Sequence, residues 1–497
     1  MTKFRKSQLV ATLAMVVTSL FTGCTSSNLE EAKCRFSVPA RTNIECGYLT
    51  VPEDRNSKNS PMIRLHFAIV HSVNEDPAPD PVVILHGGPG GYALDSMDLW
   101  LYLFSITIRD RDLIILDQRG TGYSQPSLNC PEAEEQWYQS WGHNTPTAID
   151  NQNYLQALLS CRDRLIKEGI DLNAYTSAAN AADVDDLRQA LGYSEWNLYG
   201  SSYGTRLALT IIRDHPDGVR SVVLDSVYPP QVDLTTTQTV SFERSLDLLF
   251  AACTADLSCN EKYPDLKTTF YGLAEQLDKE PVKFQLIRPS NSMFYDVILN
   301  GDRFIWTTRQ LLYLTDQIPV VPARITALQE GETASLAEQM KWFIFFDDFW
   351  SEGMFYSIHC AEDVPSSTEQ DAQRLNDTVN PRLIQAIDPS KFFYPLCSAW
   401  NTNQPTAIEN EPIISDIPTL ILSGEFDPVT PPAWGQLTAE TLSNSQFLEF
   451  PGFGHGILGS GPDTGNCSKQ IVNAFISNPD ATVDASCIDS LERPFNP

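Results

Sequence analysis

Residues 196–215 read WNLYGSSYGTRLALTIIRDH and contain the only Gly-x-Ser-x-Gly of the chain, from Gly200 to Gly204. A short apolar run precedes this motif, and leucines and isoleucines at near-helical spacing follow it. This order predicts a strand, a sharp turn and a helix, in which the turn exposes a serine hydroxyl at the end of the strand. Glycines are needed there because the backbone passes close to both elements. The glycines frame Ser202 rather than Ser201, so Ser202 is the expected nucleophile.

A second apolar run, residues 82–85, ends in the glycine-rich turn His-Gly-Gly-Pro-Gly at residues 86–90. Backbone amides in such a turn are free to donate hydrogen bonds to an oxyanion. We expect the amide of Gly88 and that of Tyr203, the residue after the nucleophile, to form this oxyanion hole. A third apolar run is followed by Asp-Gln-Arg-Gly-Thr-Gly at residues 117–122.

Two residues near the C-terminus complete the pattern. Asp427 follows the apolar run of residues 420–422, and His455 follows the apolar run that ends at Phe450. A single Asp before proline is usually a turn residue, and a single His among glycines usually lies in a solvated loop. Their joint placement after strands, in the order serine, aspartate, histidine, favours a catalytic triad. His455 would take the proton of the serine, and Asp427 would orient the imidazole.

These motifs resemble those of the prolyl and tripeptidyl aminopeptidase branch of the α/β-hydrolases. The resemblance rests on HGGPG at 86–90, DQRGTG at 117–122, GSSYG at 200–204 and DPVTP at 427–431. It covers roughly residues 45–230 and 410–490 and implies a serine exopeptidase. Because this branch also contains esterases, a carboxylesterase is an alternative. A lipid-anchored binding protein that has lost catalysis on the same scaffold is a second alternative, which the intact triad disfavours.

The alternation of apolar runs and amphipathic segments predicts a mostly parallel sheet covered by helices on both faces, and the resemblance implies that this sheet belongs to an α/β-hydrolase fold. The stretch between Ser202 and Asp427 is far longer than one or two strand–helix units require. We therefore expect a large, mainly helical cap inserted over the strand ends, where such sheets bind ligands. The expected organisation is a signal peptide at 1–23, a first core part at 24–230, the cap at 231–405 and a second core part at 406–497.

Within the expected cap, aromatic side chains crowd residues 342–356. They line an apolar pocket in one interpretation and pack the core of the cap in another, and the second is favoured because aromatic residues are usually buried. Glu362 and Asp363 follow, next to Cys360. Because a desolvated ammonium needs a carboxylate partner, Glu362 or Asp363 is the expected ligand for a peptide N-terminus. The alternative is an acidic turn on the surface.

The formal net charge of −29 argues against nucleic acid as a partner, because binding phosphates requires a basic surface. Small peptides are the expected partners, and the sequence leaves the oligomeric state open. No metal or other cofactor is expected, since the seven histidines include no His-Glu-x-x-His and the chain has no Cys-x-x-Cys.

The N-terminus has the pattern of an export signal. Lys3, Arg5 and Lys6 precede an apolar run that is too short to span a membrane comfortably. Thr22-Gly23-Cys24 resembles a bacterial lipoprotein cleavage box, although Phe21 stands where a leucine is expected. The resemblance implies export to the bacterial cell envelope, with a lipid on Cys24 as the only contact with the membrane.

The cysteines agree with an oxidising compartment. The chain has eleven, so an even number remains apart from the one expected to carry lipid. The sequence leaves their connectivity open, but the spacing favours pairs of near neighbours. The expected pairs are Cys34–Cys46, Cys130–Cys161, Cys253–Cys259, Cys360–Cys397 and Cys467–Cys487.

Overall fold

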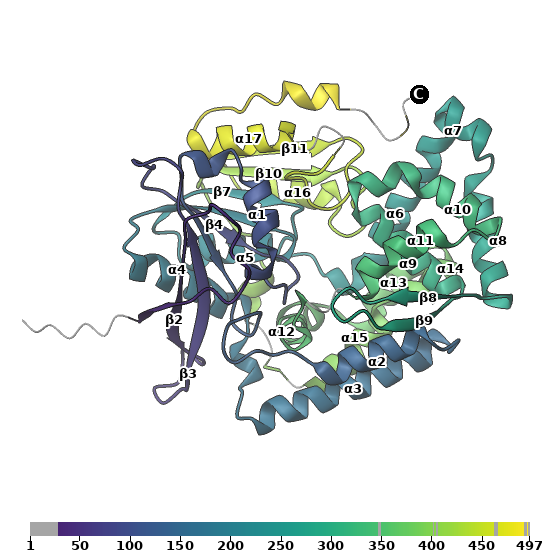
Figure 1. The fold of residues 1–497 in the computed structure, drawn as a ribbon, viewed down its shortest axis with the longest axis horizontal. Coiled ribbons are helices and arrows are strands. Elements are labelled where there is room, and N and C mark those ends of the chain that lie inside the picture. Colours follow the sequence, from purple (N-terminus) through teal and green to yellow (C-terminus); the bar gives the residue numbers. More distant parts are fainter. Residues whose placement is uncertain are drawn as a thin grey trace, which may run out of the picture.

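Nine strands form one sheet in the order β1-β2-β3-β5-β4-β6-β7-β10-β11 (Figure 1). From β5 to β11 all neighbours are parallel, and β1, β2, β3 and β5 pair antiparallel. The mostly parallel sheet predicted from the sequence is thus confirmed. The strands are β1 (Leu29–Ala32), β2 (Ile44–Pro52), β3 (Met62–Val70), β4 (Val82–Leu85), β5 (Leu113–Leu116), β6 (Trp196–Ser201), β7 (Val219–Asp225), β10 (Thr419–Gly424) and β11 (Ser445–Phe450).

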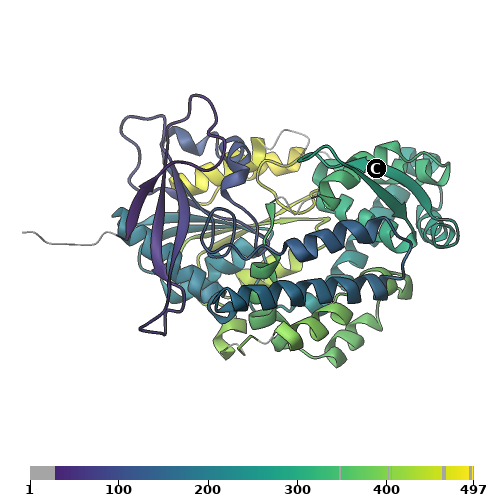
Figure 2. The same cartoon turned by 60° about the horizontal axis from the view of Figure 1, so that its bottom comes forward.

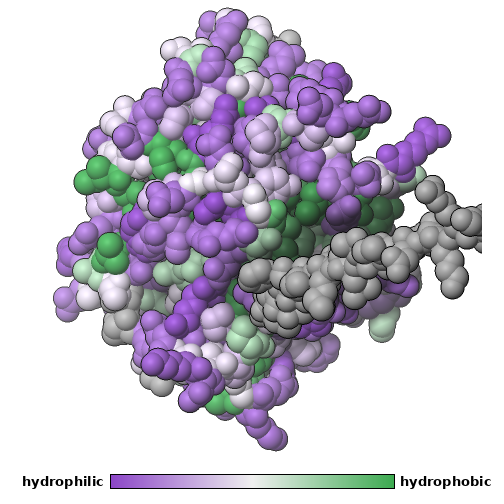
Figure 3. All heavy atoms as spheres, turned by 90° about the vertical axis from the view of Figure 1, so that its left-hand side faces the viewer, coloured by the Kyte–Doolittle hydropathy of each residue, from purple (hydrophilic) through white to green (hydrophobic). Residues whose placement is uncertain are grey.

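The computed structural model describes residues 28–495 apart from 346–348, 401, 404–405, 462–465 and 492–494. The predicted signal peptide and Cys24 lie outside the described residues. Among the described helices, none combines the length and apolar character that crossing a membrane requires. The face beside β2 and β3 is mostly hydrophilic, with hydrophobic groups scattered over it (Figure 3).

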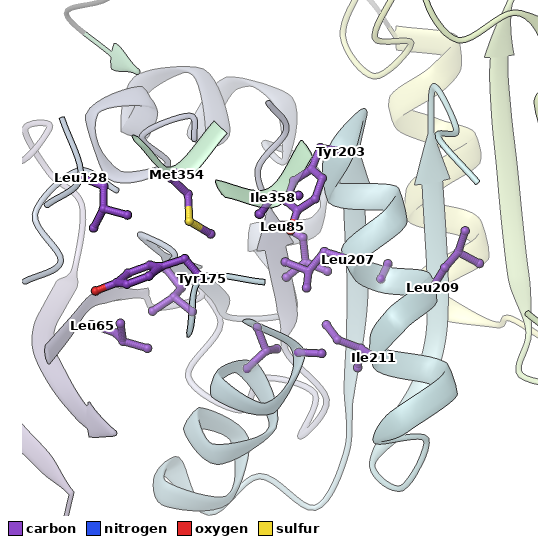
Figure 4. Close-up of a cluster of buried hydrophobic side chains, with 14 of the residues drawn as sticks. Leu65, Leu85, Leu128, Tyr175, Tyr203, Leu207, Leu209, Ile211, Met354 and Ile358 are labelled. Carbon is purple, nitrogen blue, oxygen red and sulfur yellow. The ribbon is translucent and has the colours of Figure 1, made fainter. Parts of the chain in front are cut away.

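The central strands are buried on both faces, and alternate residues serve the two sides. Val83 and Leu85 of β4 pack in the cluster that contains Leu207 and Ile211 of α5 (Tyr203–Asp214), as Figure 4 shows for three of these side chains. Val82 and Ile84 pack on the other side, in the cluster that contains residues of α1 (Met97–Leu103) and α17 (Asn466–Ser477). Helix α4 (Ser177–Leu191) lies beside α5, and α16 (Pro432–Ala439) lies against β10 and β11. Because successive side chains of a strand point to opposite faces, an all-apolar strand requires helices on both.

A second layer of helices lies beside the strand ends and has its own hydrophobic core (Figure 1; Figure 2). Most of it comes from the segment predicted as a cap, which also contributes the hairpin β8–β9. Its elements are α6 (Leu234–Ala255), α7 (Leu257–Lys262), α8 (Leu266–Lys279), β8 (Val282–Ile287), β9 (Phe294–Leu299), α9 (Gly301–Tyr313), α10 (Val321–Gln329), α11 (Ala334–Ile344), α12 (Glu352–Ile358), α13 (Glu369–Asn376), α14 (Pro381–Ile387) and α15 (Ser390–Trp400).

Two helices from the chain between β5 and β6 join this layer. Tyr138 and Trp141 of α2 (Pro131–Trp141) belong to the core of the cap, and α3 (Thr147–Lys167) packs against α15. Residues well before 231 therefore contribute to the layer over the strand ends. The pattern of predicted strands and helices did not indicate this contribution. The exact domain boundaries stay predictions.

All five predicted disulfide pairs are present in the structure. Cys130–Cys161 ties the start of α2 to α3, and Cys360–Cys397 ties the turn after α12 to α15. Each bridge joins cysteines between 6 and 37 residues apart in the sequence, as the near-neighbour pairing predicted. Five bridges are typical of a protein from an oxidising compartment.

Candidate active site

Ser202 lies between β6 and α5 in a strained backbone conformation, with φ 56° and ψ −123°. Its N–H donates to the carbonyl of Asp225 at 2.9 Å, which anchors the turn to β7. A Cβ added at Gly200 would lie 2.3 Å from the carbonyl oxygen of Gly204, and one added at Gly204 would lie 1.9 Å from that of Leu85. Both glycines of the motif are therefore required by close backbone contact. This geometry is the sharp strand–turn–helix that the sequence predicted.

Asp427 and His455 meet at the ends of β10 and β11. Nδ1 of His455 lies 2.7 Å from Oδ2 of Asp427, whose carboxylate is fully buried. The hydroxyl of Thr430 donates to the same oxygen at 2.6 Å, and the N–H groups of Val429 and Thr430 donate to Oδ1. Burial by itself raises the pKa of Asp427, but the charge of His455 and these hydrogen bonds outweigh it and lower the pKa. The carboxylate is thus ionised and orients the imidazole.

The loop that carries His455 is held from two sides. The carboxylate of Asp225, at the end of β7, accepts hydrogen bonds from the N–H groups of Ile457 and Leu458 at 2.7 and 2.9 Å. On the cap side, the N–H of His455 donates to the carbonyl of Tyr313 at 2.9 Å. The position of the imidazole therefore depends on the core and on the cap.

Tyr313, the last residue of α9, contacts two members of the predicted triad. Its ring centroid lies 4.2 Å from that of His455, and its hydroxyl interacts with the side chain of Ser202. Burial raises the pKa of this phenol above its ordinary value. Nε2 of His455 is buried and makes no hydrogen bond to the described residues. Sequence reasoning missed Tyr313, because a tyrosine at the end of a cap helix carries no signal of its own.

The predicted oxyanion amides lie around Ser202. A Cβ added at Gly87 would lie 2.9 Å from Cβ of Ser202, so the HGGPG turn passes directly beside the serine. Gly88 lines the same cavity as Ser202. Tyr203 is the first residue of α5, where a helix leaves its N–H groups without intrahelical acceptors. Their role as an oxyanion hole stays a prediction.

The cavity in front of Ser202 has a volume of about 520 Å³ and lies between the strand ends and the cap. This volume is in the range of sites for small molecules. Its wall includes five members of the aromatic stretch, whereas Phe345 lies in the cap core. Phe343 also packs against the cap core, and Tyr356 lies in another core cluster against which Phe355 packs, so the stretch lines the pocket and packs hydrophobic cores at the same time. The five are Trp342, Phe343, Trp350, Phe355 and Tyr356.

Glu362 and Asp363, the predicted ligands for an ammonium, lie in a π-helical turn after α12 and differ in surroundings. The carboxylate of Glu362 accepts hydrogen bonds from the N–H and hydroxyl of Ser177 at 2.6 and 2.7 Å, and Nε of Arg206 lies 3.3 Å away. Asp363 lines the cavity, but its oxygens accept hydrogen bonds from Tyr228, from the N–H of residue 234 and from the hydroxyl of residue 235. The surroundings of Glu362 give no support to its predicted role, because its carboxylate is already paired.

Glu352, the first residue of α12, is a further carboxylate in the wall of the cavity. It is 5% exposed and forms no ion pair with the described residues; the N–H of Cys130 donates to it at 3.3 Å. Burial raises its pKa to about 7, and backbone hydrogen bonds only partly oppose that shift. Sequence reasoning did not single out Glu352, because the aromatic run also contains Asp347 and Asp348 and the burial of one carboxylate cannot be read from the sequence.

A larger outer cavity, of about 980 Å³, adjoins the first between α3, α9 and α15. Trp306 and Arg309 of α9 and Tyr154 of α3 belong to the walls of both. Among the described residues, no group of three or more His, Cys, Asp or Glu side chains is arranged to hold a metal ion.

The fold and the site define a class, the α/β hydrolases with a serine at the nucleophile turn. A family model described as alpha/beta hydrolase fold matches residues 80–312, and one described as TAP-like protein matches residues 390–487. The chain is therefore an enzyme with the α/β-hydrolase fold, and its matches support an α/β-hydrolase peptidase family.

Three curated relatives agree with this family. Serine protease Hip1 of Mycobacterium tuberculosis is 24% identical over 464 residues, which cover 87% of this chain and 84% of the relative. Tripeptidyl aminopeptidase of Streptomyces lividans is 30% identical over 203 residues, or 38% of this chain and 36% of the relative. Proline iminopeptidase of Xylella fastidiosa is 28% identical over 156 residues, or 31% and 34%.

Proposed function

We propose that this enzyme is a serine aminopeptidase that releases short fragments from the N-terminus of peptides. The observation that carries the proposal is the buried carboxylate of Glu352, which lies without a cation partner among the described residues in the cavity that contains Ser202. Esters and amides share the same nucleophile chemistry, so selectivity must come from the cap. A buried carboxylate is the group that recognises a substrate ammonium. The names tripeptidyl aminopeptidase and proline iminopeptidase support this proposal, and the name of the third relative, serine protease, supports a peptidase.

In the proposed mechanism, Nε2 of His455 accepts the proton of Ser202 as Oγ attacks the carbonyl carbon of the scissile bond. The amides of Gly88 and Tyr203 stabilise the negative charge on the carbonyl oxygen. His455 then donates its proton to the leaving nitrogen, and an acyl-enzyme forms on Ser202. Water, deprotonated by His455, releases the acyl fragment and restores the enzyme. Asp427 stabilises the imidazolium in both steps.

The ammonium of the substrate would bind to Glu352, with Asp363 as a second negative charge in the same cavity. Asp363 accepts hydrogen bonds from three donors and lies 3.3 Å from Nδ1 of His359, whereas the described residues offer Glu352 only backbone N–H donors, its own and that of Cys130. Burial raises the pKa of Glu352 to about 7, so the approach of an ammonium stabilises its ionised form. Trp350 and Phe355 would pack against the apolar part of the released fragment.

The experiment compares hydrolysis of short peptides with a free and an acetylated N-terminus by the wild-type enzyme and by Glu352→Gln. The wild-type enzyme should prefer the free N-terminus, and Glu352→Gln should lower kcat/KM for it by about 30-fold or more, the cost of losing one partner of a buried charge pair. The variant should lose far less on acetylated peptides and on simple esters. The control is Glu330→Gln, which neutralises an exposed carboxylate of the cap and should behave as wild type. Equal cleavage of blocked and free peptides by the wild-type enzyme would reject the aminopeptidase function and favour a carboxylesterase or an endopeptidase.

We further propose that the mature enzyme is attached to the bacterial cell envelope through a lipid on Cys24. The five disulfides support export, since such bridges persist in oxidising compartments. Mass spectrometry of the N-terminal peptide should find a diacylglyceryl group on Cys24, and Cys24→Ser should release the enzyme from membranes. An unmodified Cys24 in native membranes would make the enzyme a secreted one.

A further inference from the structure

Arg309 is a buried cation without a partner in the wall of the active-site cavity. The residue is 8% exposed, and its guanidinium forms neither a hydrogen bond nor an ion pair with any described residue. Burial lowers its pKa, and the electrostatic interactions with Tyr313 and with the carboxylate of Asp427 only partly oppose this shift. Burying an unpaired charge costs several kcal/mol. Such a group is explained when an anionic ligand supplies the missing partner.

The position of Arg309 relates it to the candidate triad. Trp306, Arg309 and Tyr313 lie on one face of α9, and all three line the active-site cavity. Tyr313 packs against the ring of His455. Arg309 lies four residues earlier, which is about 6 Å along the helix axis. Because Arg309 and Trp306 also line the outer cavity, the guanidinium stands where the two cavities meet.

Arg309 and Glu352 belong to segments that contact different parts of the candidate site. The segment before Glu352 is attached to the HGGPG turn, because the N–H of Ser351 donates to the carbonyl of Gly90 at 2.9 Å. Arg309 lies on the side of His455. In acyl transfer by a serine, the histidine protonates the leaving group, so the leaving fragment lies on the histidine side. A negative charge on that fragment would meet Arg309.

We propose that Arg309 binds a carboxylate on the leaving-group side of the scissile bond, and that this is the C-terminal carboxylate of a short leaving fragment. The inference rests on the proposed peptidase function and deepens it. One extended residue spans about 3.5 Å, so the carboxylate of a fragment of one or two residues reaches the next turn of α9. With Glu352 at one end and Arg309 at the other, the cavity recognises both charged ends of a short peptide. Arg309 makes and breaks no bond and keeps its proton throughout.

The test uses three substrates with a common alanine acyl part: a tetraalanine free acid, its C-terminal amide, and an amide with glutamate as the leaving residue. Cleavage is followed by chromatography of the products. For the wild-type enzyme, kcat/KM for the free acid should exceed that for the amide by about 30-fold or more, as for one lost partner of a buried charge pair. In Arg309→Met this ratio should fall close to one, and Arg309→Lys should retain part of it. Arg324→Gln, which removes a cap guanidinium outside both cavities, should keep the wild-type ratio.

Each outcome decides the proposal. A wild-type ratio near one, or a ratio that survives in Arg309→Met, overturns it. If the wild-type enzyme cleaves the glutamate amide efficiently and Arg309→Met does not, the carboxylate site is supported, and the glutamate side chain can supply the negative charge. If the wild-type enzyme cleaves none of the peptides, the proposed function fails, and calorimetric binding to Ser202→Ala decides about Arg309. The site is supported if Ser202→Ala binds the free acid more tightly than the amide and the double variant with Arg309→Met does not. Equal binding of the two peptides by Ser202→Ala rejects it.

Discussion

Thr430 offers a sharp test of how the candidate triad is held. Its hydroxyl donates to Oδ2 of Asp427 at 2.6 Å and lies 3.1 Å from Nδ1 of His455. Thr430→Val removes this donor while keeping the shape of the side chain, and the backbone donors to Oδ1 remain. Oδ2 would then be oriented by the imidazole alone. Thr430 is thus a positioning residue, which acts on the reaction through the aspartate.

The size of the effect follows from the charge of the acceptor. A hydrogen bond to a charged group contributes about 1.5–3 kcal/mol, which corresponds to roughly 10- to 100-fold in rate. We expect Thr430→Val to lower kcat by this factor, with a smaller change in KM, because the loss concerns the stabilisation of the imidazolium in the transition state. Thr430→Ser keeps the hydroxyl and should recover most of the activity.

The assay is steady-state hydrolysis of a chromogenic ester and of a peptide, with the melting temperature measured on the same samples. Thr438→Val is the matched control, since its buried hydroxyl donates to the neutral carbonyl of Trp434 at 2.8 Å, away from the site. This control should change stability but leave kcat near wild type. A kcat for Thr430→Val within twofold of wild type, at an unchanged fold, would refute the reasoning.

Three further predictions concern the nucleophile, the cysteines and Glu352. A fluorophosphonate should label Ser202, and Ser202→Ala should lose activity by several orders of magnitude; labelling of Ser201 would contradict this. Non-reducing peptide mapping should find the five near-neighbour bridges and no free thiol in the mature chain, and any long-range bridge would count against the pairing. Glu352 has a pKa of about 7 in the folded state against an ordinary 4.5, so the folded enzyme binds the extra proton and stability falls as pH rises from about 4.5 to 7. Glu352→Gln should remove about 3 kcal/mol of this fall in the free energy of unfolding. If thermal unfolding shows the same dependence of stability on pH for the wild-type enzyme and for Glu352→Gln, the pKa shift is disproved.

The sequence by itself determined the sheet and the residues at its edge. Apolar runs followed directly by HGGPG, GSSYG, Asp427 and His455 predicted strands and the turns that end them, because a strand and its turn are adjacent in the chain. Parallel strands then bring these turns to one edge without further information. The disulfides followed for a similar reason, since each joins cysteines close in sequence.

Only the tertiary structure decided what surrounds Ser202. Glu362 and Asp363 are neighbours in sequence, but successive residues of a helical turn project in different directions, so one pairs with Arg206 and the other faces the cavity. Tyr313 and Arg309 enter the site because α9 packs over the strand ends, far from them in sequence. Helix α2 joins the cap core for the same reason. Such contacts depend on how whole helices pack against one another, and no local pattern of residues carries that information.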